Sequence, residues 1–548
     1  MFNLKSAYFY FLATKIKIIK FIKKIYFRTS AYNKSLKSDV PKQFYFYPNP
    51  FLLSSLTSNR NFSFKVSKID KNMFWEKQNS KKDERNLQSF LWLNLIDRKN
   101  DSAVIQKIIT VWIHKNSKYR NVIWESSVIS KRIISWILNS EIILNNTDNL
   151  FKKNFFQSII VQTNHLKKNL RFENDFQKKV EINCAILLTG LVFKEYSKNY
   201  ENCIYELKKS IDDFFDSDGF PINRNPNCLV QCLKYLILIK ECIKDAQKYV
   251  PEYLDEIIEK QLTCLNTIVN PDNQLPLFNG ATENNQKNFI DYIERLNYKF
   301  NKSIGMAGGL QIIKHKKNII YFDVSNAPKK EFSSSYQSGP LSFEYFLDKI
   351  KVITNCGYGA NISNKATLLS KLTSAQSSAS LNDTSVVKFE RSKFINEAFG
   401  NSITENFKTF DINFIQNEKI ISSNCSHDAY EKIFGYIFNR EIGINKDNST
   451  LFGIDKFISK KISSNAFYNI RFHLYPGISA VRTIGTKSIL IQVKKNQSLI
   501  FTAKDENISV EKSIFLGGNK ILNNLCILIS GKINDSTKII NWEFKKNI

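Results

Sequence analysis

The spacing of hydrophobic residues changes once along this chain of 548 residues. Between about residues 75 and 300, apolar side chains recur every three or four positions, as in the run from Val104 to Trp112. After about residue 305 they alternate, and QIIKHKKNIIYFDV (311–324) is typical of two short strands around a polar turn. A repeat near 3.6 predicts amphipathic helices, and a repeat of two predicts strands with one buried face. The sequence therefore predicts a helical domain followed by a sheet domain.

The helical half is predicted to consist of successive helices joined by short turns. After the helix around Val104, a second helix is expected to begin at a cap at Ser126 or Ser127. Further helices are expected near 152–170, 179–197, 201–215, 228–244 and 251–269. Short turns make neighbouring helices antiparallel, so this half can form a bundle, a solenoid or an α/α toroid. Five of the six Trp fall in its first third, namely Trp75, Trp92, Trp112, Trp124 and Trp136. Trp at helical spacing usually belongs to the core, and a row of sugar-stacking platforms is the alternative.

The second half is predicted to be a large antiparallel β-sandwich. LSFEYFLDKIKVITNCG (341–357) has the alternation of a hairpin, and further strands are expected at 385–391, 407–416, 430–445, 468–475, 488–494, 498–503 and 525–530. No strand–GxGxxG–helix and no GxxxxGK[ST] string occurs, which disfavours dinucleotide and P-loop chemistry. Three parts are expected: an N-terminal extension at 1–74 with strand character near 43–48 and 62–69, a helical domain at 75–300, and a sheet domain at 305–548.

The first 27 residues have the pattern of a basic amphipathic helix. Wound as a helix, they place Lys17, Lys20, Lys23 and Lys24 on one side and Ile18, Ile19, Phe21, Ile22 and Ile25 on the other. Such a helix can lie on a bilayer, so one expectation is peripheral contact with an anionic membrane through residues 1–27. The alternative is a helix packed on the body of the protein with its lysines in water. The apolar stretch from Ala7 to Ala13 is short and lacks the cleavage site of a signal peptide.

The chain carries 79 Lys and Arg against 50 Asp and Glu, a formal net charge of +29. A basic balance suits nucleic acid, an anionic membrane or an acidic polymer, but a composition rich in Lys, Asn and Ile also produces it without any specific partner. No nucleic-acid-binding motif accompanies the charge, so no nucleic-acid partner is expected. The nine Cys form no CxxC pair and lie in apolar runs, which favours small buried side chains over disulfides or a zinc site.

A series of local strings carries a family resemblance. In the helical half these are FLWLNLIDRKND (90–101), VWIHKNSKYRNVIWESSVISKRIISWI (111–137), GFPINRNPNCLVQCL (219–233) and LPLFNGA (275–281). In the second half they are GPLSFEYFLDKIKVITNCG (339–357), SAQSSASLNDTS (374–385), SHDAYEKIFGYIFNRE (426–441), YNIRFHLYPGISA (468–480) and EKSIFLGG (511–518). In this order, over most of residues 85–545, they resemble the heparinase II/III-like polysaccharide lyases. The resemblance implies an α+β multidomain fold, with an incomplete (α/α) toroid followed by an antiparallel β-sandwich domain.

The resemblance also implies β-elimination on an acidic, uronate-containing glycan. The C5 proton of the uronate is removed while the 4-linked sugar leaves, so a group must neutralise the carboxylate, a base must lie near C5 and an acid must reach the leaving oxygen. The family supplies these with an Asn or His and a Tyr on the toroid and a His from the sheet, beside a structural metal held by His and Asp. An acidic polysaccharide is therefore the expected partner.

This chain departs from the family at the positions that carry the chemistry. Ser335 and Gln337 stand where the family has two His, Asn355 replaces a carboxylate ligand, Gln376 replaces a further His, and Cys228 falls at the toroid Tyr. Gln and Asn are poor ligands for Zn²⁺ beside His and carboxylate. The metal site is therefore expected to be lost at Gln337, Asn355 and Gln376, and no cofactor is expected.

The polar residues that remain give a short set of site candidates. Asn183 lies near the neutralising position, and Arg471 and His473 point the same way on one predicted strand, so these three are the catalytic candidates. The substrate-binding candidates are Arg224, Asn225, Gln337, Gln376 and His427. A satisfied structural network explains Arg471 and His473 at least as well, and turn chemistry explains Asn225 before Pro226 equally well.

Two functions follow from the sequence. The first is a polysaccharide lyase that acts by β-elimination on an acidic glycan. The second is a non-catalytic descendant that binds or scaffolds an anionic envelope polysaccharide. The family commonly works in the periplasm or cell envelope, but because no clear export signal is present, a cytoplasmic or inner-membrane-associated location is also open.

Overall fold

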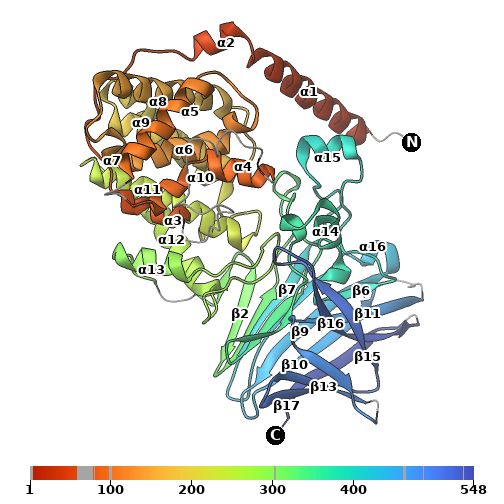
Figure 1. Cartoon of the computed structure of the whole chain (residues 1–548). Coiled ribbons are helices and arrows are strands. Elements are labelled where there is room, and N and C mark those ends of the chain that lie inside the picture. The colour runs from red at the N-terminus through yellow and green to blue at the C-terminus, as the bar shows by residue number, and fades with distance from the viewer. Residues whose placement is uncertain are drawn as a thin grey trace.

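A computed structural model describes residues 4–57, 78, 80–97, 101–301, 304–460, 465–485, 487–534 and 536–547. Figure 1 shows a helical part built from the first half of the chain and, below it, a part made mostly of strands. The helices of the first part are α1 (Leu4–Tyr26), α2 (Ser30–Ser35), α3 (Ser54–Thr57), α4 (Lys81–Gln88), α5 (Ser102–Asn116), α6 (Ser126–Leu138), α7 (Ser140–Leu144), α8 (Asn149–Leu170), α9 (Phe176–Val192), α10 (Ser197–Phe214), α11 (Pro226–Asp245), α12 (Glu252–Ile268) and α13 (Lys287–Arg295).

Side-chain caps fix where several of these helices begin. Asp148 accepts a hydrogen bond from the backbone N–H of Phe151 at the start of α8. At α11 the side chain of Asn225 accepts from the N–H of Asn227, and Pro226 occupies the first helical turn, where a missing N–H costs nothing. The helices expected from hydrophobic periodicity are confirmed, and the caps explain their first residues.

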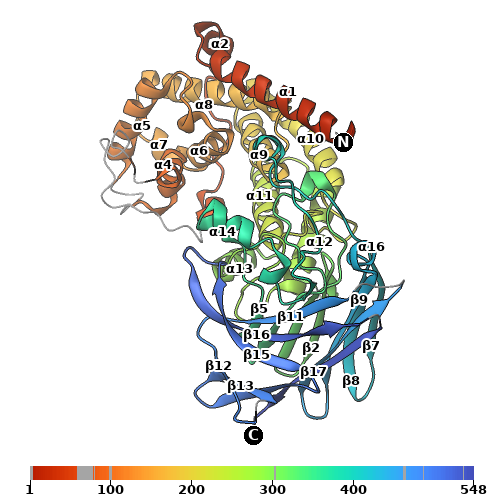
Figure 2. The ribbon, with the colours of Figure 1, turned by 90° about the vertical axis from the view of Figure 1, so that its right-hand side faces the viewer.

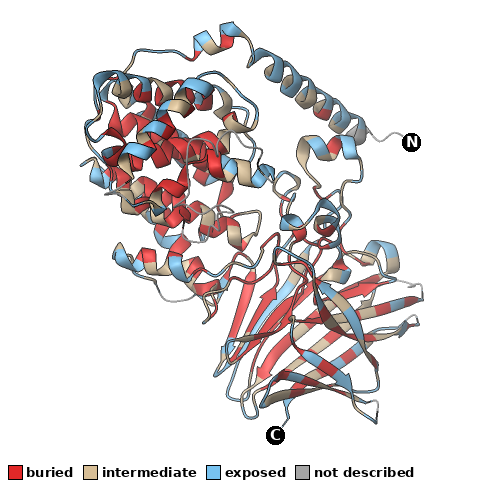
Figure 3. Cartoon of the chain, viewed as in Figure 1, coloured by how far each residue is buried: buried red, intermediate tan, exposed pale blue. Residues whose placement is uncertain are grey.

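Aromatic rings fill the centre of the helical part. The ring of Trp136 meets those of Phe90 and Trp112 edge to face, with both centroid distances 5.3 Å. Trp92 stacks on Phe90, and Trp124 is also buried. The prediction that the Trp residues belong to the core is confirmed for these four, whereas Trp75 lies outside the described residues. Figure 3 shows the buried residues concentrated between the helices.

The second part consists of two antiparallel sheets. Its strands are β1 (Met306–Ala307), β2 (Leu310–His315), β3 (Asn318–Asp323), β4 (Phe343–Leu347), β5 (Ile350–Thr354), β6 (Ala379–Leu381), β7 (Thr409–Gln416), β8 (Ile420–His427), β9 (Tyr436–Asn445), β10 (Thr450–Ser459), β11 (Ala466–Leu474), β12 (Ser479–Arg482), β13 (Ser488–Lys494), β14 (Gln497–Ala503), β15 (Asn507–Phe515), β16 (Leu522–Ile533) and β17 (Lys538–Lys546). One sheet has the order β1-β2-β3-β4-β5-β11-β16-β15, with β6 also paired to β11. The other has the order β12-β13-β14-β17-β10-β9-β8-β7. Three helices interrupt the strands, namely α14 (Asn364–Leu369), α15 (Lys393–Phe399) and α16 (Glu431–Phe434).

The two sheets pack face to face, as Figure 2 shows. Between them, the ring of Phe472 from β11 meets that of Trp542 from β17 at 4.8 Å. The same layer holds a buried ion pair: Arg440 donates to both carboxylate oxygens of Asp455, at 2.6 and 2.8 Å, and the indole N–H of Trp542 donates to Asp455 at 3.0 Å. Arg440 also donates to the carbonyl of Leu341, just before β4. The pair therefore joins one sheet to the other.

Some expected strands are corrected by the structure. Residues 43–48 form no strand, because the segment lies against α9 with a single bond from the N–H of Tyr45 to the carbonyl of Val192. Residues 385–391 form no strand either, since the N–H groups of Val386 and Val387 are taken by side-chain oxygens of Thr373 and Ser338.

Two further expected strands differ in outcome. The strand expected at 430–445 begins only at Tyr436, after α16. The strand expected near 62–69 lies outside the described residues.

The Arg440–Asp455 pair yields a stability prediction. Asp455→Ala should lower the free energy of unfolding by about 3–5 kcal/mol, because it leaves the guanidinium of Arg440 buried without its counter-charge. Urea denaturation of the purified protein measures this loss. Asp447→Ala, which removes an exposed carboxylate from the β9–β10 turn, is the matched control and should leave the midpoint nearly unchanged. Equal midpoints for the two variants would contradict the role given to the pair.

Candidate functional site

The helical part touches the sheets through a close approach at Gly280. Its N–H donates to Oε1 of Gln337 at 3.0 Å. Gly280 has a φ of +96°, and a Cβ atom there would lie 2.6 Å from the Cβ of Ser335 and 2.9 Å from Nδ2 of Asn225. Only glycine permits this backbone conformation and this approach without strain. Segments around 225, 280 and 337, far apart in the sequence, therefore meet at the domain junction.

Two glutamines organise the sheet side of this junction. Nε2 of Gln337 donates to the carbonyls of Ser370 at 2.7 Å and Gly357 at 3.1 Å. Nε2 of Gln376 donates to the same Ser370 carbonyl at 2.8 Å. Both side chains are buried. Their amides thus act as hydrogen-bond donors that hold three loops together.

A metal of the kind the family implies does not fit this arrangement. The side chain of Asn355 also has both polar atoms hydrogen-bonded. Its Oδ1 accepts from the N–H of Ser377 at 2.9 Å, and its Nδ2 donates to the carbonyl of Leu277 at 3.4 Å. The amide N–H₂ groups of Gln337 and Gln376 point at carbonyls, and a donor group cannot ligate a cation. Within the described ranges, no cluster of three His, Cys, Asp or Glu could hold one.

His473 is buried in the sheet domain with both ring nitrogens bonded. Nε2 lies 3.0 Å from the carbonyl of Ser374, and Nδ1 lies 3.0 Å from Oγ of Ser513. Because a carbonyl only accepts, the proton must sit on Nε2, and Nδ1 then accepts from Ser513. Burial lowers the pKa of His473 to about 4, so the ring is neutral at pH 7. Arg471, two residues away, donates to Oγ of Ser380 at 2.9 Å and pairs with Asp383 at 3.1 Å.

The other candidates do not gather around one point. His427 lies in β8 among the rings of Phe407, Tyr430 and Phe438, where burial lowers its pKa to about 3. Asn183 lies inside α9, and its Oδ1 has no hydrogen-bond partner in the described part of the chain.

Arg224 and Asn225 lie in the loop before α11. Arg224 donates to Asp216 at 2.7 Å, while Asn225 caps the helix. The structure therefore brings Asn225, Gln337 and Gln376 to the junction and leaves His427 and Asn183 elsewhere.

A small pocket opens beside the junction and was not expected from the sequence. It has a volume of about 210 Å³ and is lined by Gln274, Leu275, Glu283, Asn284, Asn285, Lys351 and Tyr475. The first five come from the end of the helical part, and the last two come from the sheets. The Tyr475 hydroxyl donates to Glu283, which ties the two sides together. Lys351 is almost fully buried, 3.1 Å from the carboxylate of Glu344 on β4.

Comparison with known proteins shows to which family the sheet domain is related. Residues 302–543 match the family model described as heparinase II/III-like, C-terminal. The C-terminal domain belongs to the heparinase II/III-like family. No curated protein sequence matches the chain.

The likeness of fold extends beyond the heparinase-like domain. The crystal structure of heparan sulfate lyase HepC from Pedobacter heparinus is 13% identical, with a TM-score of 0.64 over 90% of this chain and 82% of that one. A heparinase III gene product is 11% identical, with a TM-score of 0.66 over 90% and 88%. A further heparinase III structure is 12% identical, with a TM-score of 0.64 over 89% and 79%. The predicted order of α/α toroid and β-sandwich is confirmed.

Sequence reasoning missed two buried lysines in the heparinase-like domain. Lys351 lies in β5 between Ile350 and Val352, and a charged residue at this buried position of an apolar strand was the available signal. Lys371 donates its ammonium to the carbonyl of Ser334 at 2.8 Å and lies 4.3 Å from the ring centre of Phe389. Burial lowers the pKa of Lys371 to about 7. Both charges are bonded within the domain.

The neutral state of His473 yields a pH prediction. Its pKa is lowered by burial to about 4, whereas the unfolded chain titrates near pH 6.5, so between these values the unfolded state binds a proton that the native state does not. The contribution of His473 to the free energy of unfolding should therefore be highest above about pH 6.5 and fall by up to about 1.4 kcal/mol per pH unit towards pH 4. The buried His165 and His427, whose pKa burial lowers to about 3, should add decreases of the same sign. His473→Gln should weaken this dependence when urea unfolding is compared at about pH 7.5 and 5.

The exposed His114 offers the control for this measurement. His114→Gln removes a histidine from the surface of α5 and should keep the dependence of the wild type. A His473→Gln variant with the same loss of stability on acidification as the wild type would show that His473 is not held neutral.

Proposed function

We propose that the chain binds an acidic polysaccharide at the junction of its toroid and its heparinase-like domain, and does not cleave it. The proposal rests on the hydrogen bonds of the residues that, by the resemblance, stand where the family has its metal ligands and catalytic groups. Amides at Gln337, Asn355 and Gln376 are bonded to backbone groups, and His473 has both ring nitrogens bonded inside the domain. A bound glycan is supported by the fold shared with proteins named as a heparan sulfate lyase and as heparinase III.

β-Elimination needs a proton acceptor and a proton donor that touch the sugar. His473 cannot serve, because its single proton is donated to Ser374 and its other nitrogen faces Ser513. At the position of the toroid Tyr, Cys228 is buried in α11 with its Sγ 3.9 Å from that of Cys232. Lyase activity therefore stays a prediction of the resemblance, and binding without cleavage is our proposal. The junction amides likewise favour a protein that needs no metal.

The pocket at the junction offers the groups that a glycan would meet. The side chains of Gln274 and Asn284 present both donors and acceptors, which suits sugar hydroxyls. The volume of about 210 Å³ is smaller than the roughly 300–1,000 Å³ of typical ligand pockets, so the pocket would hold only a short part of a longer chain. Attraction of an acidic polymer would come from the net charge of +29, since the buried charge of Lys351 is balanced by Glu344.

The first test is for cleavage. Incubation with heparan sulfate and a panel of other uronate polymers should give no rise in near-ultraviolet absorbance, because no unsaturated product forms. A rise that is abolished by His473→Ala, Arg471→Ala or Asn183→Ala would overturn the proposal and establish the lyase instead. A known lyase under the same conditions serves as the positive control.

The second test places the glycan in the pocket through two variants with opposite effects. Asn284→Ala removes a hydrogen-bonding group and should weaken binding of a heparan sulfate oligosaccharide roughly three- to tenfold by calorimetry. Glu283→Gln removes a negative charge at the rim, keeps an oxygen to accept from Tyr475, and should tighten binding by about threefold.

A control substitution separates local from general electrostatics. Glu201→Gln makes the same change of charge at an exposed position on α10, away from the pocket, and should leave the affinity nearly unchanged. Equal tightening by Glu201→Gln and Glu283→Gln would mean that the acidic chain responds to net charge alone and that the pocket is not its site.

A further inference from the structure

Over most of its length, helix α1 contacts other described residues along one side. Near its beginning, the ring of Phe9 packs edge to face against Phe399 of α15, with centroids 6.2 Å apart. Ala13 is fully buried, and the ammonium of Lys17 lies 2.6 Å from Glu397 and 3.8 Å from the ring centre of Phe394. These residues are four apart, so they form a single side of the helix.

The opposite side of α1 carries a row of large apolar residues in solvent. Phe11, Ile18, Ile22 and Ile25 expose 66, 52, 57 and 54% of their surface, and we name them the apolar stripe. Their spacings of seven, four and three place them on one face. Figure 3 shows exposed residues along much of this helix, at the outer margin of the molecule. Monomeric soluble proteins rarely leave such a row uncovered.

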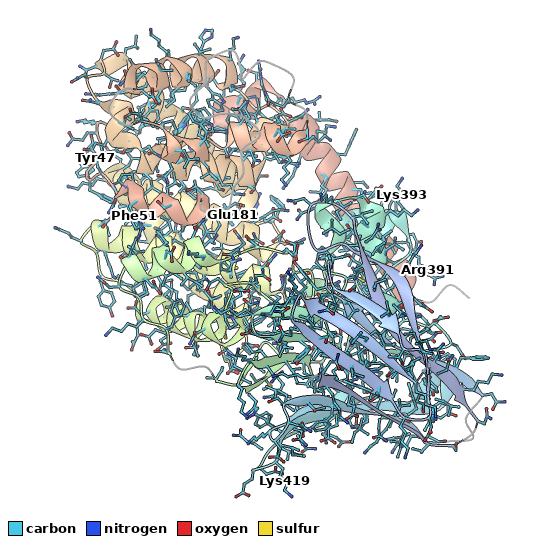
Figure 4. All side chains as sticks on the ribbon, turned by 60° about the horizontal axis from the view of Figure 1, so that its bottom comes forward. Tyr47, Phe51, Glu181, Arg391, Lys393 and Lys419 are labelled. Atoms are coloured by element: carbon cyan, nitrogen blue, oxygen red, sulfur yellow. The ribbon has the colours of Figure 1, made fainter. Side chains whose placement is uncertain are left out.

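The helix that carries the apolar stripe is basic. Helix α1 contains six Lys and no Asp or Glu. Lys15 is exposed and flanks the stripe at helical spacing from Phe11 and Ile18. Lys20 and Lys24 are exposed on the opposite side of the helix, where Lys17 pairs with Glu397. Figure 4 shows Arg391 and Lys393 beside the end of α1 that packs on α15, and both are exposed. A surface that covers the stripe therefore meets Lys15 and the positive field of a helix without acidic residues, which favours a negatively charged partner.

We propose that the apolar stripe of α1 docks on the surface of an anionic phospholipid bilayer. The stripe would enter the boundary between headgroups and acyl chains, and Lys15 beside it would contact lipid phosphates and carboxylates. Lys20 and Lys24, on the other side of the helix, would add to the attraction of the anionic surface at longer range. The contact is peripheral, because no helix in the described segments is long and apolar enough to cross a bilayer. This proposal does not depend on glycan binding, since it uses a different surface.

Charge favours a membrane over a second copy of the chain. If two α1 helices paired through their stripes, two helices with six Lys each would lie side by side, with no acidic residue on either helix to compensate. An anionic bilayer supplies the missing negative charge and an apolar layer at the same time. A bilayer can also accommodate an apolar stripe of any length, whereas a groove on a protein must match the length and shape of the stripe.

Sedimentation with lipid vesicles tests the proposal on the full chain. The wild type should bind vesicles containing about 30% phosphatidylserine at least about tenfold more tightly than vesicles of phosphatidylcholine alone, since each Lys near an anionic surface adds roughly 1 kcal/mol. Replacing Phe11, Ile18, Ile22 and Ile25 together by Ser should abolish binding to both. Replacing Lys15, Lys20 and Lys24 by Gln should remove the preference for phosphatidylserine while keeping the weaker binding to phosphatidylcholine.

The matched control replaces Leu150, Tyr205, Tyr249 and Ile521 by Ser, four large apolar residues that are also exposed but lie elsewhere. This variant should bind vesicles like the wild type. Three outcomes would overturn the proposal: no binding of the wild type to either vesicle, equal loss of binding in the control variant, or unaltered binding after the stripe is replaced. Light scattering decides the remaining case, because a dimer that is lost when the stripe is replaced would make this face a contact between copies.

Discussion

The side-chain amide of Gln337 is the contact on which the domain junction depends. One amide bonds to Gly280 of the toroid, to Gly357 after β5 and to Ser370 after α14, which lie far apart in the sequence. A neutral imidazole has one donor and one acceptor, whereas a carboxamide has two donors and one acceptor and serves all three groups. This buried amide thus joins the toroid to two loops of the sheet domain through hydrogen bonds.

Neighbouring positions are adjusted to this amide network. A Cβ atom at Gly339 would lie 2.9 Å from Cγ of Gln376. The side chain of Gln376 therefore needs a glycine opposite it, and the two residues form one structural unit. The same holds at Gly280, whose missing Cβ makes room for Ser335. A larger residue at Gly280 or Gly339 would therefore clash with these side chains.

The sequence predicted secondary structure best where an element buries one face, because hydrophobic residues then recur at the period of a helix or a strand. Helices and most strands followed from such patterns, because α6 or β11 buries a face that recurs at a fixed interval. The pattern misled at 385–391, where Val386 and Val387 bond to hydroxyl groups that no local rule could place.

The candidate site was less predictable because it depends on contacts between distant loops. The prediction that His473 and Arg471 lie on one strand is confirmed, but only the structure shows that both ring nitrogens of His473 are hydrogen-bonded, to Ser374 and Ser513. The pocket around Asn284 is formed by loops whose meeting no local pattern specifies.

Helix α1 has a mechanical consequence for the whole molecule. It packs on α15 at its beginning, and directly after its end Phe27 packs against Tyr119 and His165 of the toroid, so it spans from one domain to the other. A helix of 23 residues is a strut about 34 Å long that resists bending and stretching. Rotation of the toroid about the junction would change the distance between the ends of this strut. A hinge motion of the two domains therefore requires α1 to detach from α15, which makes the helix a lock on the angle between them.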